Sequence, residues 1–362
     1  SIAADAYENG THNEKGGKDT AVVTVRIVTA IYPNGTALVL PDGSYTATSD
    51  LNSNATVSIN QDADFSIYQV SATAGNAASI GNIDANLKDV KYSLSNNLTT
   101  INGTGIAAKQ PTNNVKTGSA TVSATATFNG EDVEIQSASL TVDDTYLFDG
   151  GDSLKVVKNY GEDTRTESAE GYNITGMDII VDGAALTVGQ GAVLGNITSK
   201  NSVTVTDGTT GDIEVTNSSA GVIIKNDVAG VEDQPVTVGD ITAAGDVTIE
   251  GSTEANGAPV TIGNVDADGD VTVTSHETMT NGQKVGAGEV TVGNITTEGT
   301  LKLSADSINT MTLGNLSGVK GYYDDCPYVA KLDVTKGTFD LNDVLYFGSI
   351  TIDDEANVTV GD

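Results

Sequence analysis

Alternate aspartates in the second half of the chain form the clearest metal-binding pattern in the sequence. Asp266, Asp268 and Asp270 stand in the run Asp-Ala-Asp-Gly-Asp. Carboxylates at this spacing can converge on a hard cation such as Ca²⁺. The run lacks the downstream glutamate that completes an EF-hand loop, so a solvated acidic turn between two strands is the competing interpretation. We therefore expect either no cofactor or Ca²⁺ at these aspartates.

Catalytic chemistry finds little support in the available side chains. The two histidines, His12 and His276, lie in predicted tail and loop segments. A histidine-based triad or a histidine-ligated zinc site is therefore not expected, and the chain has no phosphate-cradling or nucleophile-elbow motif. A pair of carboxylates for glycoside hydrolysis remains an alternative, because the chain has many acidic residues. The expected function is nevertheless not enzymatic.

Two kinds of side chain could carry covalent links. Cys326 is the single cysteine, so it is expected to be a buried apolar residue, a free thiol or an intermolecular disulfide. Asn-X-Ser/Thr sequons need an exposed asparagine to accept a glycan. They stand at Asn9, Asn34, Asn54, Asn97, Asn102, Asn173, Asn196, Asn217, Asn294, Asn315 and Asn357. Their spread fits a secreted glycoprotein.

Composition favours an exported protein over a binder of nucleic acid or membrane. The 362 residues include 41 glycines, no tryptophan and a formal charge of −32. A field this negative repels nucleic-acid phosphates and anionic headgroups, and no apolar run is long enough to be inserted across a bilayer. The sequence begins at Ser1 without Met, as expected of a mature chain after removal of a signal peptide or a tag.

A repeated hexapeptide dominates the second half of the chain. Copies of the pattern apolar-Thr-apolar-Gly-Asn/Asp-apolar begin at Val236, Val260, Val290 and Met311. A second alternating segment follows the first three copies at a constant offset, at residues 245–249, 269–273 and 299–303. Only the connection to the next copy varies in length, as a solenoid requires, because its core strands stay in register while surface loops vary.

The alternation within each repeat gives the expected core. Val236, Val238, Val247 and Ile249 should point inward and the intervening threonines outward, with glycine turning the corner and the neighbouring Asn or Asp adopting a left-handed conformation or bonding its local backbone. The sequence predicts a parallel β-helix of two-strand units. Hairpins in tandem β-sandwiches are the alternative.

The first half has a different pattern. A long strand is predicted over Ala21–Tyr32, and alternating segments on both sides of Asn129-Gly130 predict a hairpin, with a bulge near Gln136 or Ser137 where the apolar phase shifts. These features indicate an antiparallel β-sandwich. The expected organisation of the all-β chain is a flexible tail at 1–19, a sandwich-like domain at 20–157, a linker at 158–175 and a solenoid at 176–362.

The Val-Thr-Val-Gly-Asn-Ile and Gly-Asp-Val-Thr-Val repeats resemble those of secreted prokaryotic β-solenoid surface proteins, including surface-layer, sheath and adhesin components. The resemblance covers about half the chain and carries no functional residue over. It implies a load-bearing or adhesive protein outside the cell. The leading hypothesis is a subunit of a surface layer, sheath or filament whose partners are copies of itself. The second is an adhesin or module that binds surface glycans.

Overall fold

The computed structural model describes residues 2–3, 7–8, 11–12, 20–21, 25–33, 54–73, 79–82, 86–112, 115–150, 153–159, 163–166, 171–189, 191–226, 234–254, 257–306, 311–318 and 330–361. Throughout these residues the regular elements are β-strands, and no α-helix occurs among them. Within the same ranges no helix has the length and apolarity needed to cross a membrane. The all-β class predicted from the sequence is confirmed.

The chain divides into two compact units. The first comprises residues 1–110 and 116–143, and the second comprises residues 111–115 and 144–362. The division near residue 143 falls inside a strand, β13 (Ala138–Phe148), whose two halves pair within different units. Residues 163–166, inside the expected linker, form a strand of the second unit.

The first unit is built mainly from antiparallel strand pairs. They are β1 (Ile2–Ala3), β2 (Tyr7–Glu8), β3 (Thr11–His12), β4 (Thr20–Ala21), β5 (Val25–Pro33), β6 (Asn54–Ile59), β7 (Ala63–Thr73), β8 (Ser79–Asn82), β9 (Lys88–Leu94), β10 (Ile106–Ala107), β11 (Gly118–Phe128), β12 (Glu131–Asp132) and the first half of β13. β7 pairs with β5, β8 and β10, and β11 pairs with β9, β12 and β13. Ile31, Phe65 and Ile67 share one hydrophobic core with Val122 and Leu140, so strands of both sheets contribute to it.

Three local predictions for this unit are confirmed. The long strand predicted over Ala21–Tyr32 is present from Val25 onward as β5, which pairs with β7 along its whole length; Ala21 belongs to β4, and residues 22–24 lie outside the described residues. The hairpin turn is present, with positive φ at Asn129 and Gly130. The registers of β12 and β13 against β11 differ by one residue, as a bulge between them requires. In the predicted tail at 1–19, β2 pairs with β3, and β1 pairs with β4, which lies just beyond it.

The second unit contains three parallel sheets, which we number in the order in which a repeat such as β23, β24 and β25 visits them. Sheet one holds β20 (Thr209–Thr210), β23 (Val236–Val238), β26 (Val260–Ile262), β31 (Val290–Val292) and β34 (Met311–Leu313). Sheet two holds the second half of β13, β16 (Asp178–Val181), β18 (Ile197–Ser199), β21 (Ile213–Val215), β24 (Ile241–Ala243), β27 (Val265–Ala267), β32 (Ile295–Thr297), β35 (Leu316–Ser317) and β37 (Val344–Leu345).

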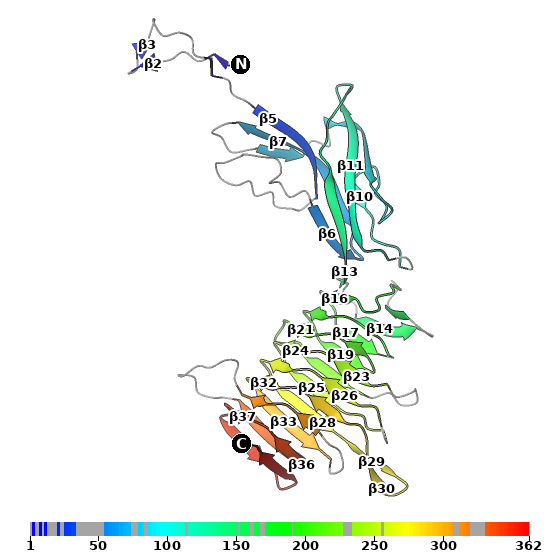
Figure 1. The fold of residues 1–362 in the computed structure, drawn as a ribbon, viewed down its shortest axis with the longest axis vertical. Coiled ribbons are helices and arrows are strands. Elements are labelled where there is room, and N and C mark those ends of the chain that lie inside the picture. The colour runs from blue at the N-terminus through cyan, green and yellow to red at the C-terminus, as the bar shows by residue number, and fades with distance from the viewer. Residues whose placement is uncertain are drawn as a thin grey trace. The chain divides into compact units, whose positions relative to one another are not determined.

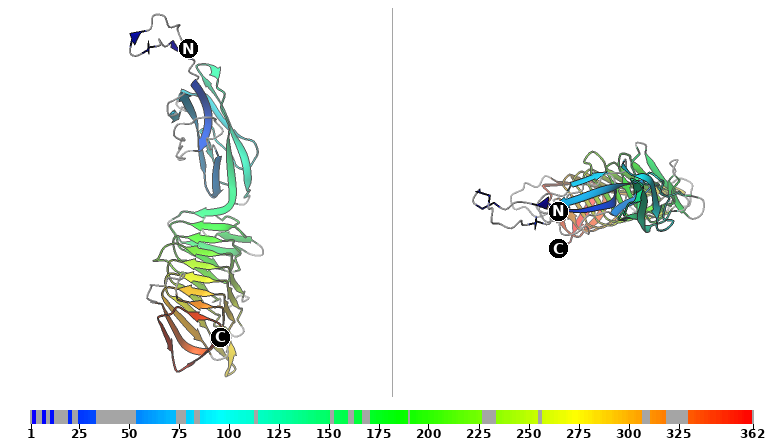
Figure 2. Two further views of the ribbon diagram at one scale, coloured as in Figure 1. Left: turned by 60° about the vertical axis from the view of Figure 1, so that its left-hand side comes forward. Right: turned by 90° about the horizontal axis from the view of Figure 1, so that it is seen from above.

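Sheet three is the most extensive of them. It holds β14 (Leu154–Asn159), β17 (Leu186–Gly189), β19 (Val203–Thr206), β22 (Val222–Lys225), β25 (Val247–Glu250), β28 (Val271–Ser275), β33 (Thr300–Ala305), β36 (Lys331–Leu341) and β38 (Ser349–Ile352). β15 (Asp163–Thr166) lies antiparallel to β14, and β39 (Ala356–Val360) lies parallel to β36. A hairpin of β29 (Glu277–Thr280) and β30 (Gln283–Gly286) follows β28. Figures 1 and 2 show the strands of this unit in successive layers.

From β20 to β36 each repeat contributes three strands, one to each sheet, so the two-strand unit expected from the sequence is wrong in this respect. The hexapeptide bends at its glycine, so β23 ends at Val238 and β24 begins at Ile241 in another sheet. The third strand, β25, then follows in sheet three. The middle strand was missed because three residues are too few to show an alternation of their own.

Inward-pointing side chains form unbroken columns. In sheet three, Ile224, Ile249 and Val273 are register partners, and none is exposed to solvent. The predicted inward residues Val236, Val238, Val247 and Ile249 are all buried, and Thr237 is exposed. Stacking of equivalent apolar residues from repeat to repeat therefore makes the core of this unit.

Candidate functional site

The corner between sheets one and two carries a ladder of Asn and Asp side chains. At each step the side-chain Oδ1 of one residue accepts a hydrogen bond from the backbone N–H of its counterpart in the next repeat. The pairs are Asp178 with Asn196 (2.6 Å), Asn196 with Asp212 (2.9 Å), Asp212 with Asp240 (2.8 Å), Asp240 with Asn264 (2.7 Å), Asn264 with Asn294 (3.0 Å) and Asn294 with Asn315 (2.9 Å). These bonds satisfy backbone donors that the turning chain takes out of the sheets.

The ladder also explains the glycine that precedes each of these residues except Asp178. A Cβ at Gly263 would overlap Oδ1 of Asp240 and lie 2.9 Å from the carbonyl carbon of Gly239. A Cβ at Gly293 would lie 2.9 Å from Oδ1 of Asn264. Neither glycine has the positive φ that would itself require glycine, so close approach between repeats selects it.

A shorter ladder at the corner between sheets two and three contains one of the predicted calcium ligands. The backbone N–H of Asp270 donates to Oδ1 of Asp246 at 2.8 Å, and Oδ1 of Asp270 accepts the backbone N–H of Thr300 at 2.7 Å. Asp270 thus links three successive repeats. The expectation that such residues bond their own local backbone is wrong at both corners, because the partner lies one repeat away.

The three aspartates predicted to bind Ca²⁺ have different surroundings. Asp266 is a half-buried residue of β27, Asp268 is exposed in the following turn, and Asp270 belongs to the corner ladder. Across the described residues no group of three or more His, Cys, Asp or Glu side chains is placed to share a metal ion. The geometry therefore does not bring these carboxylates together.

Most candidate glycan acceptors lie at the surface. The exposed ones are Asn54, Asn97, Asn102, Asn196, Asn217, Asn294, Asn315 and Asn357. Asn173 is half-buried, and its Oδ1 accepts the hydroxyl of Thr175 at 3.1 Å. Asn9, Asn34 and Cys326 lie outside the described residues.

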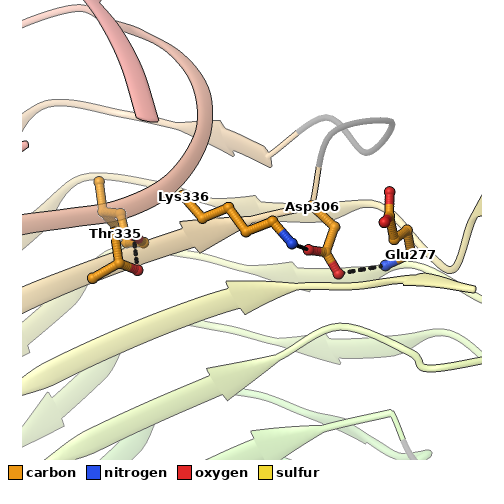
Figure 3. A network of polar contacts seen from close by, with 5 residues as sticks. Glu277, Asp306, Thr335 and Lys336 are labelled. Carbon is orange, nitrogen blue, oxygen red and sulfur yellow. Dashed lines mark hydrogen bonds and ion pairs between the residues drawn. The ribbon is translucent and has the colours of Figure 1, made fainter. Parts of the chain in front are cut away.

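A polar cluster secures the base of the β29–β30 hairpin (Figure 3). Asp306 forms an ion pair with Lys336, and its Oδ2 accepts the backbone N–H of Glu277 at 3.1 Å. The register of β36 against β33 shifts between Leu303 and Ser304, so Thr335 is an extra residue before Lys336. This bulge directs Lys336 toward Asp306.

The pKa values of this pair follow from its contacts. Burial of Asp306 acts to raise its pKa, but the hydrogen bonds from Lys336 and from the Glu277 N–H outweigh burial and hold the pKa below its usual value. The hydrogen bond to Asp306 raises the pKa of Lys336 above its usual value, against a smaller opposing effect of desolvation. Both groups are therefore charged at neutral pH.

The two ends of the repeat stack differ in how their cores are covered. At the end where the stack begins, Tyr146 and Tyr172 are buried with ring centroids 5.3 Å apart, and Ile174 packs fully buried in the same segment. At the other end lie the last strands, β37, β38 and β39, which we call the terminal edge. No described strand pairs with the outer side of β38.

Core positions at the terminal edge are open to solvent. Ile350 and Ile352 are the register partners of Leu332 and Val334, which are each 1% exposed. Ile350 itself is 54% exposed and Ile352 is 49% exposed. Val360, on the neighbouring strand β39, is the register partner of buried Leu341 and is 51% exposed. The columns of the core thus continue to the last strand, where nothing among the described residues covers them.

Sequence reasoning missed the terminal edge. The segment Ser349–Ile352 has the same alternation as the buried core strands, so its residue types alone do not mark it as exposed. The clustered tyrosines Tyr322, Tyr323 and Tyr328, the aromatic residues considered for an adhesive surface, lie outside the described residues.

Comparisons with known proteins identify no relative of this chain. No protein-family model matches the chain. No curated protein and no solved structure matches it significantly. The function is therefore inferred from sequence and geometry.

Proposed function

We propose that this chain is a structural, non-catalytic subunit that assembles with copies of itself into a surface layer, sheath or filament outside a prokaryotic cell. The terminal edge carries the proposal. Ile350 and Ile352 occupy core positions yet are about half exposed, and an uncovered strand next to exposed aliphatic side chains favours the addition of another strand. Association through such strand edges would bury them.

In this proposal the first unit is a β-sandwich and the second is a three-sided parallel β-helix. A hydrophobic core shared by residues of two antiparallel sheets supports the sandwich. Three parallel sheets that each gain a strand in successive repeats support the helix. Such solenoids transmit load along the stack, because each repeat contacts only its neighbours.

Surface chemistry supports a place outside the cell. The formal charge of −32 keeps an abundant exported protein soluble, and eight of the sequon asparagines are exposed, as glycan attachment requires. Ca²⁺ or a salty medium would reduce repulsion between acidic subunits.

The test compares two double variants that make the same chemical change at different places. Ile350→Lys/Ile352→Lys places charge on the terminal edge. Ile180→Lys/Ile223→Lys changes two isoleucines that are each 39% exposed on outward faces of the stack. Sedimentation velocity over a concentration series measures association, and electron microscopy shows any regular assembly.

The proposal expects the wild type and the Ile180/Ile223 variant to associate and to form regular assemblies, and the Ile350/Ile352 variant to associate less and to form none. Circular dichroism confirms that each variant is folded. A wild-type chain that remains monomeric at every concentration and salt would overturn the proposal, as would equal association of the two variants.

A further inference from the structure

We propose that the terminal edge of one molecule pairs with the terminal edge of a second copy about a twofold axis, with Thr351 opposite Thr351 of the other molecule. This inference rests on the proposed function, since it names the partner and the register of the strand association. It is carried by the alternation of β38, by the exposure of its core residues, and by the positions of the neighbouring acids.

The side-chain alternation of β38 restricts the register. Residues directly opposite each other in a sheet share a face, so core-facing Ile350 must meet another core-facing residue. In an antiparallel pair related by a twofold axis, placing the axis at Thr351 sets Ile350 opposite Ile352 of the other copy, and Ile352 opposite Ile350. Shifting the axis by one residue to either neighbouring isoleucine loses one of these contacts.

The same register continues the core from one molecule to the next. A twofold axis perpendicular to the sheet leaves both cores on the same side of it. Ile350 and Ile352 then cover each other as Leu332 and Val334 are covered by the strands on both sides of β36. Thr351, which is exposed on the outward face, forms a Thr–Thr cross-strand pair.

The acidic residues next to β38 do not prevent this contact. Asp353, Asp354 and Glu355 follow the strand directly. With the axis at Thr351, Asp353 falls opposite Ser349 of the other molecule. The two acidic turns therefore lie at opposite ends of the paired strands, away from each other. A self-complementary edge of this kind suits a second copy, because isologous contacts about twofold axes are the commonest association of identical chains. Such a contact closes at two molecules, so the pair would be the repeating unit of the assembly and further contacts would join the pairs.

The experiment uses a single cysteine at the axis. Paired residues in a β-ladder have Cα atoms about 4.5 to 5.5 Å apart, which a disulfide can span. The 362-residue chain is prepared as Cys326→Ser with Thr351→Cys and is mildly oxidised. The control carries Cys326→Ser with Thr237→Cys, an exposed threonine on an outward face in the middle of the stack. Non-reducing electrophoresis and intact mass measure the covalent dimer.

Pairing holds the two thiols at a high effective concentration, so the expected yield of reducible dimer from Thr351→Cys is at least about tenfold that from Thr237→Cys. Adding Ile350→Lys/Ile352→Lys to the Thr351→Cys chain should abolish the difference. Association of the wild type without this cross-link would overturn the twofold register while leaving self-assembly intact. Absence of any association would overturn both the register and self-assembly. Equal cross-linking at the two positions would mean that the disulfides arise from unspecific oxidation, and it would overturn the register.

Discussion

Oδ1 of Asp240 accepts a hydrogen bond from the backbone N–H of Asn264, its counterpart one repeat further along the stack, at 2.7 Å. Asn264 accepts the N–H of Asn294 in the same way at 3.0 Å. The Asn/Asp position of the hexapeptide is therefore a contact between repeats and not only a turn residue. It keeps neighbouring corners in register while loops elsewhere vary in length.

Removing one acceptor from this ladder should cost stability without altering the fold. For Asp240→Ala we expect a loss of about 1 kcal/mol, the usual net value of one hydrogen bond, because the longer, exposed bonds from Asn264 Nδ2 at 3.2 and 3.4 Å should add little. Asp240→Asn keeps an oxygen in the same place and should change stability by less than about 0.5 kcal/mol. Urea unfolding of both variants measures the difference. Equal destabilisation by Ala and Asn would show that the carboxylate charge, and not the acceptor, matters here.

The glycine beside the ladder should tolerate no side chain. Gly263→Ala introduces a Cβ that overlaps Oδ1 of Asp240, and forcing an atom into a packed site costs about 1 to 3 kcal/mol. Because part of the overlap is with the Asp240 side chain, the cost should fall in an Asp240→Ala background. A double-mutant cycle measures this coupling. Additive effects would indicate that only the backbone around Gly239 opposes the new methyl group.

The sequence predicted the repeats better than their corners. Alternation in segments such as Val236–Val238 identifies the buried face, because a period of two leaves little choice once one face must be covered. The middle strand Ile241–Ala243 and the partners of Asp240 were not predictable in this way. Both depend on where the next repeat lies, which three-residue segments and single polar side chains do not encode locally.

The candidate sites were less predictable than the fold. Spacing suggested that Asp266, Asp268 and Asp270 converge, but the corner turns the chain between them and Asp270 bonds to the next repeat. The exposed core positions Ile350 and Ile352 could not be identified from sequence, because their residue types match those of buried strands. Exposure of a core-type residue becomes visible only when its neighbours are placed.

The Asp306–Lys336 pair should make the β29–β30 hairpin sensitive to acid. A lowered pKa on Asp306 means that its contribution to stability is complete above its unfolded pKa near 3.8 and is lost as pH falls through the lower folded value. The raised pKa of Lys336 means that its contribution is present below 10.5 and is lost as pH rises through its folded value. Between these limits the contribution should be constant.

The variant Asp306→Asn tests the direction of this pH dependence. We expect up to about 1 kcal/mol of destabilisation at pH 7, faster hydrogen exchange at the Glu277 amide, and a difference from wild type that shrinks below pH 3.8. The control is Asp182→Asn, which removes an exposed pair with Lys200 at 2.9 Å and should have a smaller effect. If Asp306→Asn is equally destabilising in acid, the loss of stability would come from altered packing and not from the lost charge.

Association should strengthen with ionic strength. Each chain carries a formal charge of −32, and the screening length falls from about 30 Å at 0.01 M to about 8 Å at 0.15 M salt. We expect sedimentation to show tighter association as NaCl is raised, with the same dependence after treatment with EDTA. Loss of association in EDTA at constant ionic strength would instead assign it to bound Ca²⁺, whose carboxylate ligands would then need to be located.

Two isoleucines in one column provide a matched test of the open end. Ile249 and Ile352 occupy equivalent inward positions of sheet three, but Ile249 is 0% exposed and Ile352 is 49% exposed. Truncating a buried isoleucine to alanine leaves a cavity and costs about 2 to 5 kcal/mol. The same change at a half-exposed position removes few contacts, so Ile352→Ala should cost less than about 1 kcal/mol in the monomer.

Urea unfolding at a concentration too low for association measures both monomer stabilities, and sedimentation at higher concentration measures association. Ile249→Ala should unfold at lower urea yet associate normally while folded, because its side chain lies far from the last strand. Ile352→Ala should unfold close to the wild type but associate less, because the methyl groups that it removes are those a second molecule would cover. Equal destabilisation of the dilute monomers would mean that the column is already covered at Ile352 within a single chain, and strand addition there would have no free edge to use.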